Sequence, residues 1–95
     1  MKIWIDDVRP EPPGYVRCKS VNETKRMILD AERSGLPVEV LDLDHDAGEY
    51  EPDGGDYIKL LDWMAETGRK YPVKLHTANP VGRANMERLI RRYLV

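Results

Sequence analysis

The segment Val38–Asp46, VEVLDLDHD, decides the fold of this chain. It starts with the apolar residues of a buried strand and ends with acids at alternate positions, Asp42, Asp44 and Asp46. Apolar residues followed abruptly by carboxylates indicate a core strand that delivers charge to its carboxyl end. In open parallel α/β sheets, ligands bind at that edge. The segment therefore predicts a central strand that leads into a binding site.

Two other segments repeat this pattern of a short apolar strand that ends in polar, reactive side chains. They are residues 2–5, followed by Asp6-Asp7, and residues 73–75, followed by His76-Thr77. Three strands that end in this way predict one shared site at one edge of the sheet.

Composition predicts one small globular domain over residues 1–95. Hydrophobic residues make up 41% and charged residues 34%, which is typical of a folded chain rather than a disordered one. The net charge of -2 predicts no general nucleic-acid-binding surface. A polyanionic ligand would therefore have to be held locally, by arginines, a helix N-terminus or a metal ion.

The sequence also predicts a cytoplasmic protein without a membrane partner. The single cysteine, Cys18, excludes an internal disulfide and fits a reducing compartment. The N-terminal segment reaches Asp6 after too few apolar residues for a signal peptide. No apolar run is long enough to span a bilayer.

Local signals predict the element order β-β-α-β-α-β-α. Residues 6–14, DDVRPEPPG, hold three prolines and a glycine and predict a rigid loop between the first two strands. A parallel crossover usually needs about a dozen residues, so the orientation of the second strand, residues 15–18, stays open. Helices are predicted from Ser20, over residues 56–67 and from Asn79. This order indicates a doubly wound or three-layer α/β fold.

The carboxylates at two strand ends predict a cation site. Asp6, Asp7, Asp44 and Asp46 can supply oxygen ligands to a hard divalent cation. Four carboxylates this close repel one another unless a cation or protons neutralise them. We predict Mg²⁺ as the metal, with Mn²⁺ or Ca²⁺ as alternatives. The competing interpretation is that these acids are solvated at the mouth of a loop.

A phosphate-binding wall is predicted opposite these acids, from Arg9, Thr77, Asn79 and Arg83. Free backbone N–H groups at the N-terminus of the last helix attract phosphate. Asn79 and Arg83 fall in its first turn, and Arg9 can reach in from the first loop. The alternative is that Asn79 only caps the helix and that Arg83 is an ordinary surface residue.

The only two histidines of the chain, His45 and His76, both fall at predicted strand ends. One can act as general base and the other as general acid near neutral pH. With Asp44 and Thr77 they form the predicted catalytic set. The alternative is structural, with both imidazoles bound to loop carbonyls.

The motifs in these segments resemble the cyclic-phosphate processing receiver domains, small receiver-like proteins of phages and bacteria. The segments are IWIDDVRPEPPGY (3–15), LDLDHDAG (41–48), GGDYIKLLDWM (54–64) and LHTANPVGRANM (75–86). The resemblance implies a receiver-like three-layer α/β sandwich. Its mostly parallel sheet would have about four strands and carry three helices, without the first helix and fifth strand of a receiver.

By this resemblance, Asp6 and Asp7 match the metal-binding acids of a receiver and Thr77 matches its hydroxyl residue. Asp44 matches the central aspartate, with Asp42 as the other candidate. The residues that belong to this family's own motifs are His45, Asp46, His76 and Asn79. A receiver carries a lysine on its fifth strand, and its absence argues against aspartyl-phosphate signalling.

The resemblance implies a metal-assisted phosphoesterase that processes cyclic phosphates, such as the 2′,3′-cyclic ends of RNA. One alternative is a non-catalytic module that binds a phosphate ligand, a partner protein or a second copy of itself. Another is a phosphoacceptor that uses Asp44 or Asp42. If the protein is phage-encoded, the expected compartment is the host cytoplasm.

Overall fold

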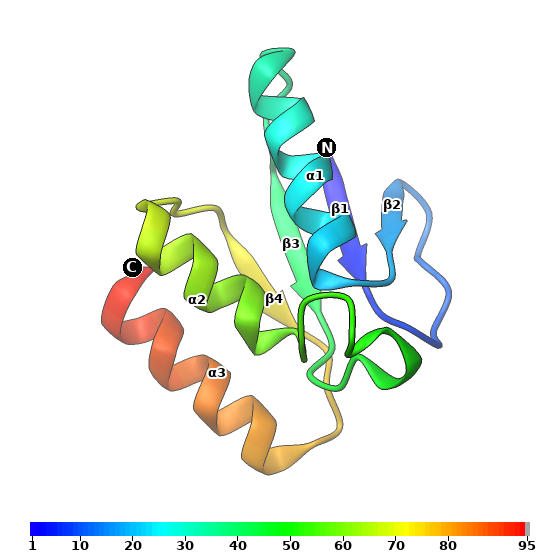
Figure 1. The fold of residues 1–95 in the computed structure, drawn as a ribbon, viewed down its shortest axis with the longest axis vertical. Coiled ribbons are helices and arrows are strands. Elements are labelled where there is room, and N and C mark those ends of the chain that lie inside the picture. Colours follow the sequence, from blue (N-terminus) through cyan, green and yellow to red (C-terminus); the bar gives the residue numbers. More distant parts are fainter. Residues whose placement is uncertain (95) are drawn as a thin grey trace.

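The computed structural model of the protein describes residues 1–94, and its element order is the predicted one (Figure 1). The elements are β1 (Lys2–Ile5), β2 (Tyr15–Cys18), α1 (Val21–Arg33), β3 (Val40–Leu43), the short 3₁₀ helix η1 (Gly48–Tyr50), α2 (Ile58–Thr67), β4 (Val73–Leu75) and α3 (Pro80–Tyr93). None of the helices in residues 1–94 has the length and apolar character needed to cross a membrane.

The four strands form one sheet in the order β2-β1-β3-β4, and all of its pairings are parallel. The open question about β2 is thereby answered, since β2 runs parallel to β1 after a connection that contains no helix. The backbone N–H of Asp6 donates to the carbonyl of Cys18 (3.2 Å), and that of Tyr15 donates to Pro12 (3.2 Å). These bonds hold the proline-rich loop, residues 6–14, against the ends of both strands.

The hydrophobic core lies on one face of this sheet. The register pairs Ile3 with Leu41 and Ile5 with Leu43, and all four side chains are fully buried. One apolar cluster joins this face to buried residues of the three helices, namely Val21, Ile28, Ala31, Leu60, Leu61, Met64 and Met86. The three helices therefore cover the same face.

No helix of residues 1–94 packs on the opposite face, which carries Lys2, Trp4, Tyr15, Arg17 and Lys74. The expected receiver-like α/β fold is confirmed in its four parallel strands and three helices, but it has two layers instead of three. The crossovers from β2 to β3 and from β3 to β4 step the same way across the sheet. Right-handed crossovers in one direction place their helices on one face. The step from β1 to β2 runs the other way, and its helix is replaced by the loop.

Two helix starts follow the predicted capping chemistry. The Ser20 hydroxyl accepts the N–H of Glu23 (3.0 Å) in front of α1. The Asn79 carboxamide oxygen accepts the N–H of Gly82 (3.0 Å) in front of α3, where Pro80 takes the first helical position. Each cap satisfies a backbone donor that the helix itself leaves free. The cap at Asn79 fixes the N-terminus of α3 at the edge where the strands end.

Candidate functional site

Asp6, Asp44 and His76, which we call the strand-end trio, lie side by side at the carboxyl edge of the sheet. The N–H of Asp44 donates to the carbonyl of Ile5 (3.0 Å), and that of His76 donates to Leu43 (2.9 Å). These bonds continue the parallel ladder for one step beyond the strands. Each member of the trio offers a ligand atom, and these atoms all lie within 4.8 Å of one another. The trio can therefore hold a metal ion.

The imidazole of His76 is fixed on three sides. Its Nδ1 lies 2.7 Å from Oδ1 of Asp42, and its Nε2 lies 2.9 Å from Oδ2 of Asp6. Its ring stacks on the indole of Trp4, with centroids 3.7 Å apart and planes 3° apart. A neutral imidazole carries one N–H, so only the imidazolium donates to both carboxylates at once. Alternatively, Nδ1–H donates to Asp42 and Nε2 is left to bind a cation.

Asp6 is held as a buried anion. Its side chain is completely buried, and its Oδ1 accepts the N–H groups of Val8 and Arg9, both at 2.8 Å. Burial is the largest influence and raises the pKa of Asp6, but the hydrogen bonds from Arg9, Val8 and His76 outweigh it and hold the pKa below the usual value for an aspartate. Asp6 is therefore held in place as a carboxylate that could bind a cation.

Asp7 lies beside the trio, and both burial and the negative charges of Asp6 and Asp44 affect the pKa of its carboxyl. Burial raises the pKa of the Asp7 carboxyl, and the carboxylates of Asp6 and Asp44 raise it further. A Cβ added to Gly48 would lie 2.2 Å from Oδ2 of Asp7, so the glycine leaves the space that this carboxylate uses. Uncompensated repulsion of this kind is what a bound cation relieves. Two carboxylates and an imidazole, with a third carboxylate close by, fit a divalent cation.

His45 and Asp46 form a separate pair next to the trio. The Nδ1 of His45 lies 2.9 Å from Oδ1 of Asp46, whose side chain is 63% exposed. The His45 ring rests on α3, because a Cβ added to Gly82 would lie 2.4 Å from its Cγ. The structure thus brings Asp46 to His45, and Asp46 is not a member of the trio.

Replacing Gly82 with alanine is expected to displace His45 and to destabilise the protein by about 1–3 kcal/mol, as overpacking usually does. In an unobstructed helix the same change stabilises by up to about 1 kcal/mol. Urea denaturation of Gly82→Ala measures the difference. The control is Asn85→Ala, an exposed site in the same helix, where we expect little change. A Gly82→Ala protein at least as stable as the wild type would show that the contact is not tight.

The structure places the predicted phosphate-binding residues in different surroundings. Arg9 reaches the trio, since its Nη1 donates to the backbone carbonyl of His76 (2.8 Å). Thr77 is only 6% exposed, and its hydroxyl accepts the N–H of Asn79 (3.1 Å). The Asn79 carboxamide oxygen is likewise used by the cap at Gly82. Thr77 and Asn79 therefore build the N-terminus of α3, while Arg9 brings a guanidinium to the edge.

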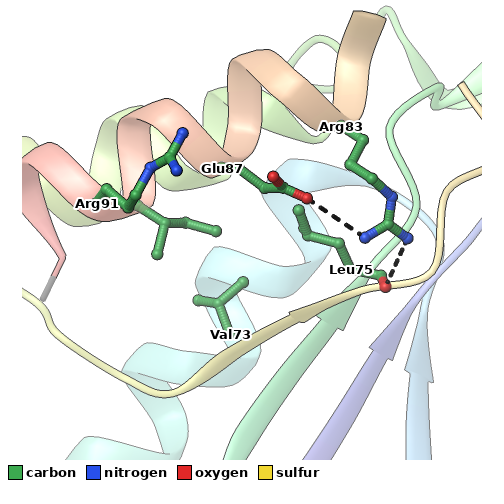
Figure 2. A pocket seen from close by; sticks show the side chains of 6 residues that line it. Val73, Leu75, Arg83, Glu87 and Arg91 are labelled. Atoms are coloured by element: carbon green, nitrogen blue, oxygen red, sulfur yellow. Dashed lines mark hydrogen bonds and ion pairs between the residues drawn. The ribbon is translucent and has the colours of Figure 1, made fainter. Parts of the chain in front are cut away.

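Arg83 lies in a pocket between β4 and α3, at the outer edge of the sheet (Figure 2). Its guanidinium donates to the carbonyls of Leu75 (3.1 Å) and Thr77 (3.4 Å) and lies 3.5 Å from the carboxylate of Glu87. The lining of this pocket, which contains no member of the trio, consists of Val73, Leu75, Arg83, Glu87, Ile90 and Arg91. Arg83 is therefore occupied by the edge of β4.

The structure adds two residues, Asp42 and Trp4, to this site. Asp42, the other candidate for the central aspartate, binds His76, and Asp44 is the acid that lies with Asp6. Trp4 supports the His76 ring. Strand alternation places Trp4 and Asp42 on one face, and the parallel register pairs them directly. Strand alternation alone could place each residue on this face, but pairing Trp4 with Asp42 also required the register of β1 on β3.

An all-parallel sheet, with acids after β1 and β3 and a hydroxyl residue after β4, defines a receiver-like α/β domain. A family model for the cyclic-phosphate processing receiver domain matches residues 1–92, and the chain belongs to this family. No match was found for the chain among curated proteins or among solved structures.

Proposed function

We propose that this receiver-like domain is a metal-assisted phosphoesterase that opens cyclic phosphates, with the 2′,3′-cyclic ends of RNA as the leading substrate class. The observation that carries the proposal is the strand-end trio, three metal-ligating side chains whose ligand atoms lie within 4.8 Å of one another beside a second histidine. Membership of the cyclic-phosphate processing family supports the choice of substrate.

The residues that would hold the metal are Asp6, Asp44 and His76, the last through Nε2. Asp42 would then accept the N–H of Nδ1 and orient the ring, which is the usual partner arrangement for a ligating histidine. Mg²⁺ prefers oxygen ligands, whereas an imidazole nitrogen suits softer divalent ions. Mn²⁺ accommodates both kinds of ligand. A bound divalent ion supplies Lewis acidity for the phosphoryl oxygens and lowers the pKa of bound water.

Proton transfer falls to His45 in this proposal. With Nδ1–H donated to Asp46, Nε2 is the nitrogen left to accept a proton from the attacking water. The water oxygen forms a bond to phosphorus, the ring P–O bond breaks, and the proton returns from His45 to the released sugar oxygen. Water is thus added across one P–O bond. The guanidinium of Arg9 and the N-terminus of α3 would stabilise charge on the phosphoryl oxygens.

A second candidate is a module that binds a phosphate ligand or a partner protein without turnover. The observation that favours it is the internal pairing at the edge. Both nitrogens of His76 contact carboxylates, and the side-chain oxygens of Thr77 and Asn79 are used by the helix start. Polar groups that satisfy one another in this way are also typical of a network whose role is to stabilise the structure.

Metal titration tests the proposal first. We expect Mn²⁺ and Mg²⁺ to raise the melting temperature, because a ligand at 100 times its Kd stabilises by about 2.7 kcal/mol, or roughly 10 °C or more for a domain of this size. A 2′,3′-cyclic nucleotide added with the metal should be converted to a monophosphate. The control is Asp30→Asn, which removes an exposed acid of α1 that pairs with Arg33. The proposal would be rejected if the metals raise the melting temperature of the wild type by no more than ionic strength explains and no monophosphate is formed. A metal response without product would favour the binding module.

A further inference from the structure

The uncovered face of the sheet carries two aromatic rings beside the site. Trp4 and Tyr15 lie on this face, both half-buried, with the edge of one ring against the other at 5.9 Å and 78°. Neither belongs to the apolar core, which fills the opposite face. Aromatic rings on a sheet surface are the usual platform on which single-stranded nucleic acids stack their bases.

Basic side chains share this face with the rings, and the ammonium group of Lys2 lies 5.8 Å from the centre of the Tyr15 ring. Lys2, Lys74 and Arg9 are exposed, Arg17 is half-buried, and none of them forms an ion pair with a carboxylate of residues 1–94. The acid among the strand residues of this face is Asp42, which is taken up by His76. The chain as a whole has a net charge of -2, so positive charge is concentrated here. The net charge predicted no general nucleic-acid-binding surface, but a net charge does not show how the charged side chains are distributed between the faces of the protein.

The same face leads directly into the strand-end trio. Lys2 and Trp4 of β1 point to this side by strand alternation, and Trp4 stacks on His76. His76 in turn contacts Asp6, which follows β1. One alternation step along a strand is about 7 Å. One face of Trp4 is already covered by His76. A nucleotide chain stacked on Tyr15 and passing over Trp4 would therefore bring its terminal phosphate to the trio.

We propose that this face binds the single strand that carries the terminal cyclic phosphate, so that the substrate is an oligonucleotide rather than a free nucleotide. The proposal rests on the proposed function of the trio. Tyr15 offers a base-stacking surface, and Lys2 and Lys74 neutralise backbone phosphates. A duplex keeps its bases stacked internally and cannot use the rings. The occupant is therefore single-stranded.

The test is the binding of a fluorescent single-stranded RNA that ends in a 3′-phosphate and cannot turn over. We expect the double variant Lys2→Glu/Lys74→Glu to bind about tenfold more weakly or worse at low salt. Tyr15→Ala should lose at least about fivefold, the loss of one stacked base. The matched control is Lys59→Glu/Arg88→Glu, the same charge change on α2 and α3, where we expect less than about a twofold effect.

The binding assay and a turnover assay separate the two proposals. In the Lys2, Lys74 and Tyr15 variants, hydrolysis of a free 2′,3′-cyclic nucleotide should be unchanged while KM for the oligonucleotide rises. If the wild type has no turnover but the binding pattern holds, the surface stands and the enzyme proposal falls. Equal weakening by the control variant, or equal binding of a duplex, would overturn the surface proposal. Absence of any RNA binding would also overturn it and would leave the face to a protein partner.

Discussion

Replacing Asp44 with asparagine is expected to abolish turnover of a cyclic phosphate while leaving the fold intact. Oδ1 of Asp44 accepts the N–H of His45 (2.7 Å), and an amide oxygen can accept the same bond. The change therefore removes a negative charge from the trio without removing the acceptor. Loss of a partner that only orients a ligand already costs about 10–100-fold, so loss of a ligand should cost at least about 100-fold.

This result is measured as product formation at saturating Mn²⁺, with circular dichroism and thermal unfolding to verify the fold. Asp30→Asn, which has the same chemistry on the exposed side of α1, should keep full activity. An Asp44→Asn protein with normal turnover would show that Asp44 is not part of the reaction centre. Loss of activity in both variants would point to a general effect of charge.

Replacing His76 with leucine is expected to lower both stability and metal affinity. In this variant Oδ2 of Asp6 and Oδ1 of Asp42 lose their shared donor, and Asp6 is completely buried. Breaking a buried pair from one side costs about 3 kcal/mol. Oδ1 of Asp6 keeps the N–H groups of Val8 and Arg9, but its Oδ2 is left buried without a partner. The stacked contact with Trp4 is lost as well. Urea denaturation without metal measures this change.

The metal response of the same variant tests the role of Nε2. If His76 is a ligand, the rise in melting temperature produced by Mn²⁺ should largely disappear in His76→Leu. Asp42→Asn is the companion variant, since it keeps the imidazole and alters only its orientation; an intermediate response is expected. A full response in His76→Leu would assign the cation to the carboxylates alone, with Asp7 as the remaining candidate.

Much of the fold could be predicted because its signals are local. A strand followed at once by acids, as at Leu43 and Asp44, can be recognised from neighbouring residues alone. Ser20 and Asn79 predicted the starts of α1 and α3, because their side chains accept hydrogen bonds from N–H groups within the next turn. Convergence at one edge then followed from the parallel sheet, since carboxyl ends of parallel strands meet.

The remaining features depend on contacts between distant residues. The orientation of β2 could not be derived from loop length, because bonds between distant residues, such as Asp6 to Cys18, replace the usual helix. The pairing of His76 with Asp42 required the register of β4 on β3. Arg83 shows a further difficulty. A long flexible side chain in the first turn of α3 could reach several partners, and the nearby carbonyl of Leu75 accepts it.

The stack of Trp4 on His76 gives the protein an internal optical reporter. Because the His76 ring lies directly against the Trp4 indole, a change in the charge or position of that ring is expected to change the indole emission. The only other tryptophan, Trp63, lies under the guanidinium of Arg69 at 4.5 Å, and Trp63→Phe leaves Trp4 as the single tryptophan. Emission from Trp4 would then follow what occupies the edge of the sheet, in real time and without a label.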